Sequence, residues 1–142
     1  MKNIMIMSML FVSIAYAVTT TEVFVDSKTK LEWQNQSINK TAKVADWVEA
    51  IDYCEDLELE SKNDWRLPNI IELKSLIDYE RYEPAIVSAL IDTSANGYYW
   101  SATSASRTTK KDEAFFVGFG SGYSNTISKS TSSNYVRCVR DN

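Results

Sequence analysis

The spacing of hydrophobic positions along the chain changes near residue 97. Before this point, apolar side chains recur every three or four residues, as on helices that bury one face. After it, aromatic and β-branched residues dominate short runs, as in strands. Two short strands around a polar turn are predicted earlier, within residues 24–34 (FVDSKTKLEWQ). This order of strands, helices and then strands indicates an α+β fold.

The first helix is predicted from an amphipathic run with Thr41 as its N-cap. Acidic side chains fall on one side of this run and Cys54 falls on the other, so we expect this cysteine to face the core. The predicted apolar side consists of Val44, Trp47, Val48, Ile51, Cys54 and Leu57.

The second helix is predicted within residues 63–78 (NDWRLPNIIELKSLID), a run that begins as a loop. Pro68 disfavours a helical conformation at Leu67. Asn69 and Glu72, three residues apart, form an asparagine version of the capping box. The residues predicted to face inward are Ile70, Leu73, Leu76 and Ile77, followed by Ile86 and Leu90 in a third short helix after Pro84.

Three late strands are predicted at residues 98–104 (YYWSATS), 113–122 (EAFFVGFGSG) and 134–141 (NYVRCVRD). Loops rich in Ser, Thr, Asn and Lys join them. The predicted architecture is therefore two main helices packed on a small antiparallel sheet with long loops.

The first residues have the pattern of a secretory signal peptide. One lysine precedes an apolar stretch at residues 4–14, and residues 15–17 read AYA, so cleavage is expected after Ala17. A membrane anchor is the alternative, but the apolar stretch is shorter than the roughly 20 residues that span a bilayer. We therefore expect an exported protein, periplasmic or extracellular, whose mature chain is a single domain over residues 18–142.

The chain contains two cysteines, Cys54 and Cys138, and no histidine. In an exported chain, two cysteines first predict a disulfide, which here would contribute roughly 4 kcal/mol on the chain-entropy model. A redox pair and two metal thiolates are alternatives, although the C-x-x-C spacing typical of both is absent. Without histidine there is no Ser-His or Cys-His pair and no imidazole metal site. We expect no catalytic residues, no metal and no cofactor.

Charge is uneven along the chain. Residues 18–92 carry 8 basic and 16 acidic side chains, a net of −8, whereas residues 93–142 carry 6 basic and 3 acidic, a net of +3. The acidic total argues against nucleic-acid binding, and the basic C-terminal part suits an anionic ligand. The candidate ligand contacts are four loop cations, Arg107, Lys110, Lys111 and Lys129, partly offset by Asp112 and Glu113, and two aromatic residues in polar surroundings, Tyr98 and Tyr123.

The tetrad Trp65-Arg66-Leu67-Pro68 is interpreted as a packing device. The guanidinium of Arg66 can tie loop carbonyls or a carboxylate, and Asp64 and Glu72 are the candidate partners. The remaining tryptophans, Trp33, Trp47 and Trp100, are interpreted as core residues.

Six segments in a fixed order together resemble the Lcl C-terminal domain family, which is named for the end of collagen-like bacterial adhesins. They are residues 26–33 (DSKTKLEW), 47–54, 64–73 (DWRLPNIIEL), 99–103 (YWSAT), 116–122 and 135–140 (YVRCVR). The family often has glycine where Lys30 stands here.

The resemblance implies a C-type-lectin-like fold, related to that of formylglycine-generating enzymes, with a long-range disulfide between the first helix and the final strand. Members at the end of collagen-like adhesins bind sulfated glycosaminoglycans. The oxidase activity of the formylglycine-generating relatives is not carried over, because it needs a reactive cysteine pair. Lectin-like calcium sites use a Glu-Pro-Asn or Gln-Pro-Asp loop, whereas residues 83–85 here are Glu-Pro-Ala, which leaves Asn96 and Asp112 as alternative oxygen donors.

The sequence thus predicts an exported, non-enzymatic binding domain whose late loops hold a sulfated or other anionic glycan at a cell surface. A protein–protein interaction module of a surface or periplasmic assembly is the alternative, with Tyr98 and Tyr123 as its dominant contacts. An enzyme related to the formylglycine-generating oxidases is the third hypothesis.

Overall fold

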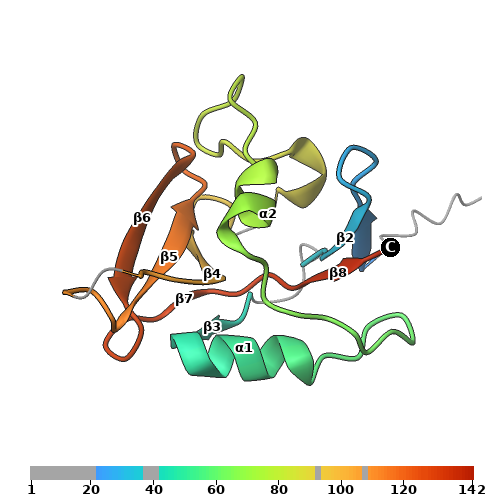
Figure 1. The fold of residues 1–142 in the computed structure, drawn as a ribbon. Helices are drawn as coiled ribbons and strands as arrows, with labels where there is room; N and C mark the ends of the chain where they lie inside the picture. Colours follow the sequence, from blue (N-terminus) through green and yellow to red (C-terminus); the bar gives the residue numbers. More distant parts are fainter. Residues whose placement is uncertain (1–21, 37–41, 92–93, 107–108) are drawn as a thin grey trace, which may run out of the picture.

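The computed structural model describes residues 22–36, 42–91, 94–106 and 109–142, and its mixture of helices and strands confirms the α+β class. The predicted signal peptide, the predicted cap Thr41 and the candidate contact Arg107 lie outside these residues. The strands form two sheets rather than one (Figure 1).

The smaller sheet joins the two ends of the described chain. It contains β1 (Val23–Val25), β2 (Leu31–Gln34) and β8 (Val139–Asp141) in the antiparallel order β1-β2-β8. The β1–β2 turn is held by Asp26, whose carboxylate accepts hydrogen bonds from the backbone N–H of Lys28 and the hydroxyl of Thr29. The predicted early strand pair is confirmed.

The larger sheet has the order β3-β7-β4-β5-β6. Its pairs are antiparallel except β4 and β7, which run parallel with Tyr99 opposite Tyr135. In Figure 1, β6 forms its outer edge on the side away from the smaller sheet. The strands are β3 (Val44–Ala45), β4 (Tyr98–Ser104), β5 (Glu113–Gly118), β6 (Tyr123–Ser128) and β7 (Asn134–Tyr135).

The first helix, α1 (Trp47–Glu55), is shorter than predicted. Its cap is Asp46, whose carboxylate accepts a hydrogen bond of 2.9 Å from the N–H of Glu49. Val44 was predicted on the helix but lies in β3, because its backbone pairs with β7. Val48 was predicted to face inward and is 58% exposed, whereas Cys54 is fully buried as predicted.

The second helix, α2 (Ile70–Ser75), has the predicted capping box, with the Asn69 carboxamide and the Glu72 carboxylate bonding each other's backbone N–H. The third predicted helix is the 3₁₀ turn η1 (Ser88–Leu90). The expectation of two main helices on one small sheet is not confirmed. The described chain has one nine-residue helix, one six-residue helix and two sheets.

The late part of the chain departs from the prediction at two places. The strand predicted over residues 134–141 is two strands, β7 and β8, which belong to different sheets. The segment YSNTIS, which belongs to an expected polar loop, forms β6, since its backbone pairs along the whole of β5. The strand predicted at residues 113–122 ends at Gly118, where the chain turns toward β6.

A disulfide between Cys54 and Cys138 confirms the predicted bridge, with Cα atoms 5.5 Å apart. It joins α1 to the segment that passes from the larger sheet to the smaller one, and both cysteines are fully buried. Among the helices described, none is both long enough and apolar enough to span a bilayer.

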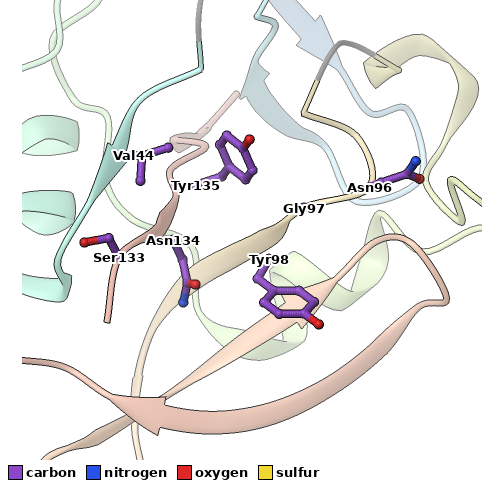
Figure 2. Close-up of a pocket in the computed structure, with 7 residues that line it drawn as sticks. All are labelled: Val44, Asn96, Gly97, Tyr98, Ser133, Asn134 and Tyr135. Carbon is purple, nitrogen blue, oxygen red and sulfur yellow. The ribbon is translucent and has the colours of Figure 1, made fainter. Parts of the chain in front are cut away.

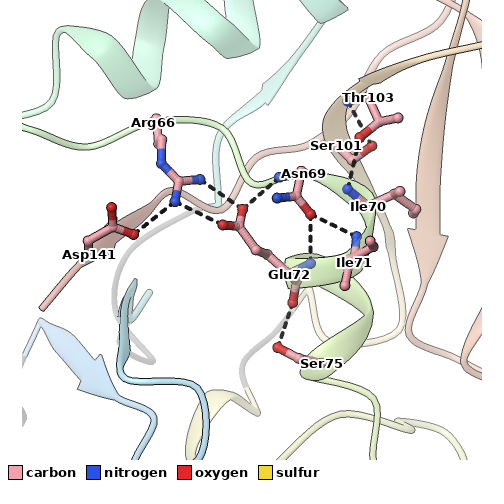
Figure 3. Close-up of polar contacts among 9 residues, drawn as sticks. All are labelled: Arg66, Asn69, Ile70, Ile71, Glu72, Ser75, Ser101, Thr103 and Asp141. Carbon is pink, nitrogen blue, oxygen red and sulfur yellow. Dashed lines mark hydrogen bonds and ion pairs between the residues drawn. The ribbon is translucent and has the colours of Figure 1, made fainter.

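The tetrad at residues 65–68 connects the two sheets to α2, as Figure 3 shows in part. The backbone of Arg66 exchanges both hydrogen bonds with Val139 in β8, and the carbonyl of Pro68 accepts from Ala102 in β4. The guanidinium of Arg66 binds both oxygens of Glu72 at 2.8 Å and also contacts Asp141. The choice between Asp64 and Glu72 as its partner is therefore settled for Glu72.

Most of the tryptophans interpreted as core residues are buried in the structure. Trp65 and Pro68 are buried, and so are Trp33 and Trp100, whereas Trp47 is partly buried. Asp64 instead pairs with Arg140. The tetrad acts through packing and hydrogen bonds within the fold.

Candidate functional site

The two candidate tyrosines lie together at one end of the larger sheet. Tyr98 opens β4, Tyr123 opens β6, and both flank Gly118, the last residue of β5 between them. The rings of Tyr98 and Tyr123 meet edge to face with centroids 5.8 Å apart, and Phe116 packs against both. A side chain at Gly118 would meet these two rings at 2.7–3.0 Å, so glycine here lets them close over the strand.

Tyr98 also borders a cleft of about 410 Å³, within the usual range of roughly 300–1,000 Å³ for small-molecule sites. The cleft lies where the starts of the parallel strands β4 and β7 meet β3 (Figure 2). Its lining residues are Val44, Asn96, Gly97, Tyr98, Ser133, Asn134 and Tyr135.

Asn134 is the most unusual residue of this lining. Its side chain is 7% exposed, and its Nδ2 has no hydrogen-bond partner among the residues that the structure describes. Figure 2 shows the carboxamide directed toward the side of the cleft where Tyr98 lies. A buried amide without a partner costs folding free energy, so its presence calls for a physical explanation, of which a bound ligand is one.

The cleft wall around Gly97 is rigidly defined. A Cβ atom at Gly97 would lie 2.2 Å from the ring of Tyr135, so only glycine allows this ring to pack across the strand. The Gly97 carbonyl accepts a hydrogen bond of 3.1 Å from the N–H of Phe119, which ties the start of β4 to the β5–β6 turn. The Tyr135 ring and this backbone hydrogen bond therefore hold Gly97, the residue before Tyr98, in place.

No lining residue of the cleft carries a formal charge. A hydrogen bond with Tyr98 and, as the smaller cause, burial raise the pKa of the Tyr123 hydroxyl to about 12. This hydroxyl stays protonated at neutral pH. The site offers aromatic faces, hydroxyls and carboxamides rather than ions.

The candidate lysines lie at the opposite end of the same strands. Lys110 and Lys111 precede β5, and Lys129 follows β6, whereas Tyr98 begins β4. The length of β4 separates the two groups by roughly 20 Å. The structure therefore brings the tyrosines together and places the described lysines elsewhere.

Two of these lysines already have intramolecular partners. Lys110 donates to the carboxylate of Glu113 at 2.8 Å and lies 3.3 Å from the hydroxyl of Thr126. Hydrogen bonds that Glu113 accepts from Lys110 and then from the hydroxyl of Thr126 lower the pKa of its carboxyl. The ammonium of Lys129 lies 4.1 Å from the centre of the Trp47 ring and donates to Ser104. Lys111 is exposed.

Part of the positive charge of residues 93–142 is paired within the fold. Arg137 is fully buried and donates to the carbonyl of Gln34, and Arg140 binds Glu32 and Asp64. These two cations stabilise the fold and do not form a surface patch. The positive charge counted in the sequence therefore overstates what a ligand can meet.

The alternative calcium donors are not close partners. Asn96 lines the cleft, whereas Asp112 lies at the lysine end and accepts hydrogen bonds from Ser128 and Ser130. Within the described residues, no group of three or more His, Cys, Asp or Glu side chains could hold a metal ion.

Sequence reasoning missed Asn134, Ser133 and the role of Gly97. The one available signal was an asparagine at the start of a strand, a position where this residue type is depleted. Its burial depends on β3 and β4, which come from distant parts of the chain, so the sequence alone did not indicate it.

These observations define a disulfide-stabilised α+β domain with an uncharged surface cleft. The family comparison is consistent with this class: the model of the Lcl C-terminal domain matches residues 22–140. The chain belongs to this family, which confirms the resemblance drawn from its motifs. No match to a curated protein was found. The family and the disulfide are consistent with export.

Proposed function

We propose that this surface-associated domain is an exported, non-enzymatic module that binds a glycan, and that the cleft beside Tyr98 is its binding site. The observation that carries the proposal is that one cleft contains a half-exposed tyrosine ring and a buried asparagine, Asn134, whose Nδ2 has no partner among the described residues. We also propose that the fold is C-type-lectin-like, supported by family membership and by the disulfide from α1 to the end of the chain.

The chemistry of the cleft suits a sugar ring. A pyranose presents a face of C–H groups that can lie on an aromatic ring, and its edge carries hydroxyls that need hydrogen-bond partners. Tyr98 is 45% exposed and supplies the ring, while Asn134 and Ser133 supply polar groups beside it. Few precisely placed polar groups in a mostly apolar cleft are typical of small-molecule sites.

The absence of enzymatic activity belongs to the same proposal. Both cysteines are joined in the disulfide, and the chain has no histidine. The cleft lining contains neither a carboxylate nor a cysteine that could act as a nucleophile or general acid.

A glycan array tests this function directly. We expect the folded protein to bind a subset of glycans, Tyr98→Ala to lose at least about tenfold in affinity, and Tyr98→Phe to stay within about threefold because it keeps the ring. Tyr79→Ala is the matched control, since Tyr79 is 78% exposed and is not part of the cleft. Absence of binding by the folded wild-type protein to every glycan would overturn the proposal.

Protein–protein interaction is the second candidate function. The observation that favours it is the loop at residues 78–83, which carries Tyr79 and Tyr82 at 78% and 71% exposure and projects from the fold in Figure 1. Exposed tyrosines are enriched at interfaces. Replacing both by alanine would abolish binding to a surface partner under this hypothesis and leave glycan binding unchanged.

A further inference from the structure

Resting on the proposed function, we infer that the cleft takes an uncharged sugar unit and that Asn134 is the specificity-determining residue that donates a hydrogen bond to it. The inferred ligand is uncharged, unlike the sulfated glycans expected from the sequence. It follows from three features of the cleft, namely its uncharged lining, the buried amide of Asn134 and the ring of Tyr98, and from the distance between the cleft and the lysines.

The lining rejects a charged group. Its seven residues are Val44, Asn96, Gly97, Tyr98, Ser133, Asn134 and Tyr135, none of which is ionic. A sulfate or carboxylate that entered the cleft would lose part of its hydration without gaining a cation, which is strongly unfavourable. A hydroxyl loses far less and can be satisfied by neutral donors and acceptors.

Asn134 supplies a donor held in a defined place. Its backbone pairs with Ala45 in β3, and its side chain is more than nine-tenths buried, so its orientation is restricted by the surrounding strands. Nδ2 is itself buried and has no partner among the described residues, so a ligand oxygen that meets it when the carboxamide turns toward the cleft displaces no protein hydrogen bond. A site built to satisfy one buried donor discriminates strongly against ligands that lack the acceptor.

Tyr98 provides the adjoining surface. Its ring is fixed from behind by Phe116, with centroids 5.0 Å apart, and from the side by Tyr123. A sugar unit that meets Asn134 therefore finds a preformed platform at the same cleft, and little reorganisation of the Tyr98 ring is required on binding.

The salt dependence of binding distinguishes the cleft from the lysines as the ligand site. Lys110, Lys111 and Lys129 lie at the far end of β4 to β6, roughly 20 Å from Tyr98. Binding through those lysines would weaken steeply with salt, whereas binding in the uncharged cleft would not. Salt dependence and the identity of the sensitive residue therefore separate the two surfaces.

The experiment compares matched neutral and sulfated polysaccharides. The neutral panel is dextran, mannan and galactan, and the charged probes are dextran sulfate and heparin, all measured by biolayer interferometry at about 50 and about 500 mM NaCl. We expect binding to at least one neutral polysaccharide that changes less than about twofold between the two salt concentrations. We expect dextran sulfate to bind no better than dextran.

Two substitutions at asparagine complete the test. Asn134→Leu keeps the approximate shape but removes the donor, and we expect it to weaken neutral-glycan binding at least about tenfold. Asn125→Leu is the matched control, because Asn125 is an exposed asparagine of β6 outside the cleft, and we expect an unchanged affinity. Both variants are checked for a cooperative unfolding transition, so that a loss of folding is recognised as such.

The outcomes separate this inference from the proposed function. Salt-sensitive binding of the sulfated probes alone, reduced by Lys111→Ala and unaffected by Asn134→Leu, would overturn the inference but preserve glycan binding. Binding to neither class would overturn both. Equal affinity of Asn134→Leu and the wild-type protein for a neutral polysaccharide would refute the role of Asn134.

Discussion

Replacing Asn134 by leucine should raise the free energy of unfolding while it weakens glycan binding, and both effects come from the loss of the same amide nitrogen. Asn134 is 7% exposed, and its Nδ2 has no partner in the part of the chain that the structure describes. An unsatisfied buried amide costs about 1–3 kcal/mol of folding free energy. Leucine has a similar branched shape and no polar atoms, so most of this cost is removed.

The expected gain is smaller than the full penalty. Repacking around a new apolar side chain commonly costs up to about 1.5 kcal/mol even when volume is nearly conserved. We therefore predict that Asn134→Leu raises the free energy of unfolding by about 1 kcal/mol, equivalent to about 4 °C in melting temperature for a domain of this size. Structural residues show the opposite behaviour on substitution, since most core changes destabilise by about 1 kcal/mol or more.

The assay is urea unfolding followed by tryptophan fluorescence, in parallel with polysaccharide binding. The chain has four tryptophans, of which Trp33, Trp65 and Trp100 are buried, so unfolding changes the signal strongly. An Asn134→Leu protein that loses more than about 1 kcal/mol would refute the reasoning, because the amide would then have a structural partner.

Three further predictions concern the fold. Reduction of the Cys54–Cys138 disulfide, which spans 84 residues, should lower the free energy of unfolding by about 4–5 kcal/mol. Urea titrations with and without reductant measure this loss, and a loss below about 1 kcal/mol would contradict the prediction. Lys30 has a φ of 63°, a conformation that favours glycine, so Lys30→Gly should raise the free energy of unfolding by about 0.5–1 kcal/mol in the same titration. A lower free energy of unfolding would show that the lysine side chain contributes more than the backbone strain costs. Burial raises the pKa of Glu32, but hydrogen bonds from Lys62 and Arg140 outweigh it and leave the pKa below its usual value. The ionised carboxylate therefore stabilises the fold above about pH 4.3, and this contribution is lost as the pH falls through the lowered pKa. Thermal melts between about pH 7 and pH 2 should show a shallower loss for Glu32→Gln than for the wild-type protein, and equal slopes would remove Glu32 from the explanation.

The local signals in the sequence were sufficient for much of the fold. The capping box of Asn69 and Glu72 and the turn at Asp26 involve residues within a few positions of each other, so they could be predicted and are observed. The Cys54–Cys138 disulfide could be predicted because only two cysteines occur in a chain with an export signal pattern.

Features that depend on distant pairing could not be predicted in this way. Val44 matches a helical period but is extended because β7, some 90 residues later, provides its hydrogen-bond partner. The polar segment of β6 is a strand because β5 lies beside it, not because its residues favour strands. Residues 134–141 divide between two sheets, which no local pattern indicates.

In the candidate site, too, some features could be predicted from the sequence and others could not. Tyr98 and Tyr123 were recognised from their type and surroundings, and the structure brings them together. The count of cations indicated an anionic ligand, but Lys110, Arg137 and Arg140 are engaged within the fold, and sequence alone does not reveal such partners. The decisive feature is a buried amide nitrogen that has no partner in the described part of the chain, and it forms only when β3, β4 and β7 come together.

The most direct test of the cleft is a ¹H–¹⁵N NMR titration of the wild-type protein with the neutral polysaccharide that binds most tightly in the panel. The side-chain amide signals of Asn134 should shift strongly, together with the backbone signals of Gly97 and Tyr98. The side-chain amide signals of Asn125 should not shift. Shifts confined to Lys110, Lys111 and Lys129, with the Asn134 amide unmoved, would contradict the account.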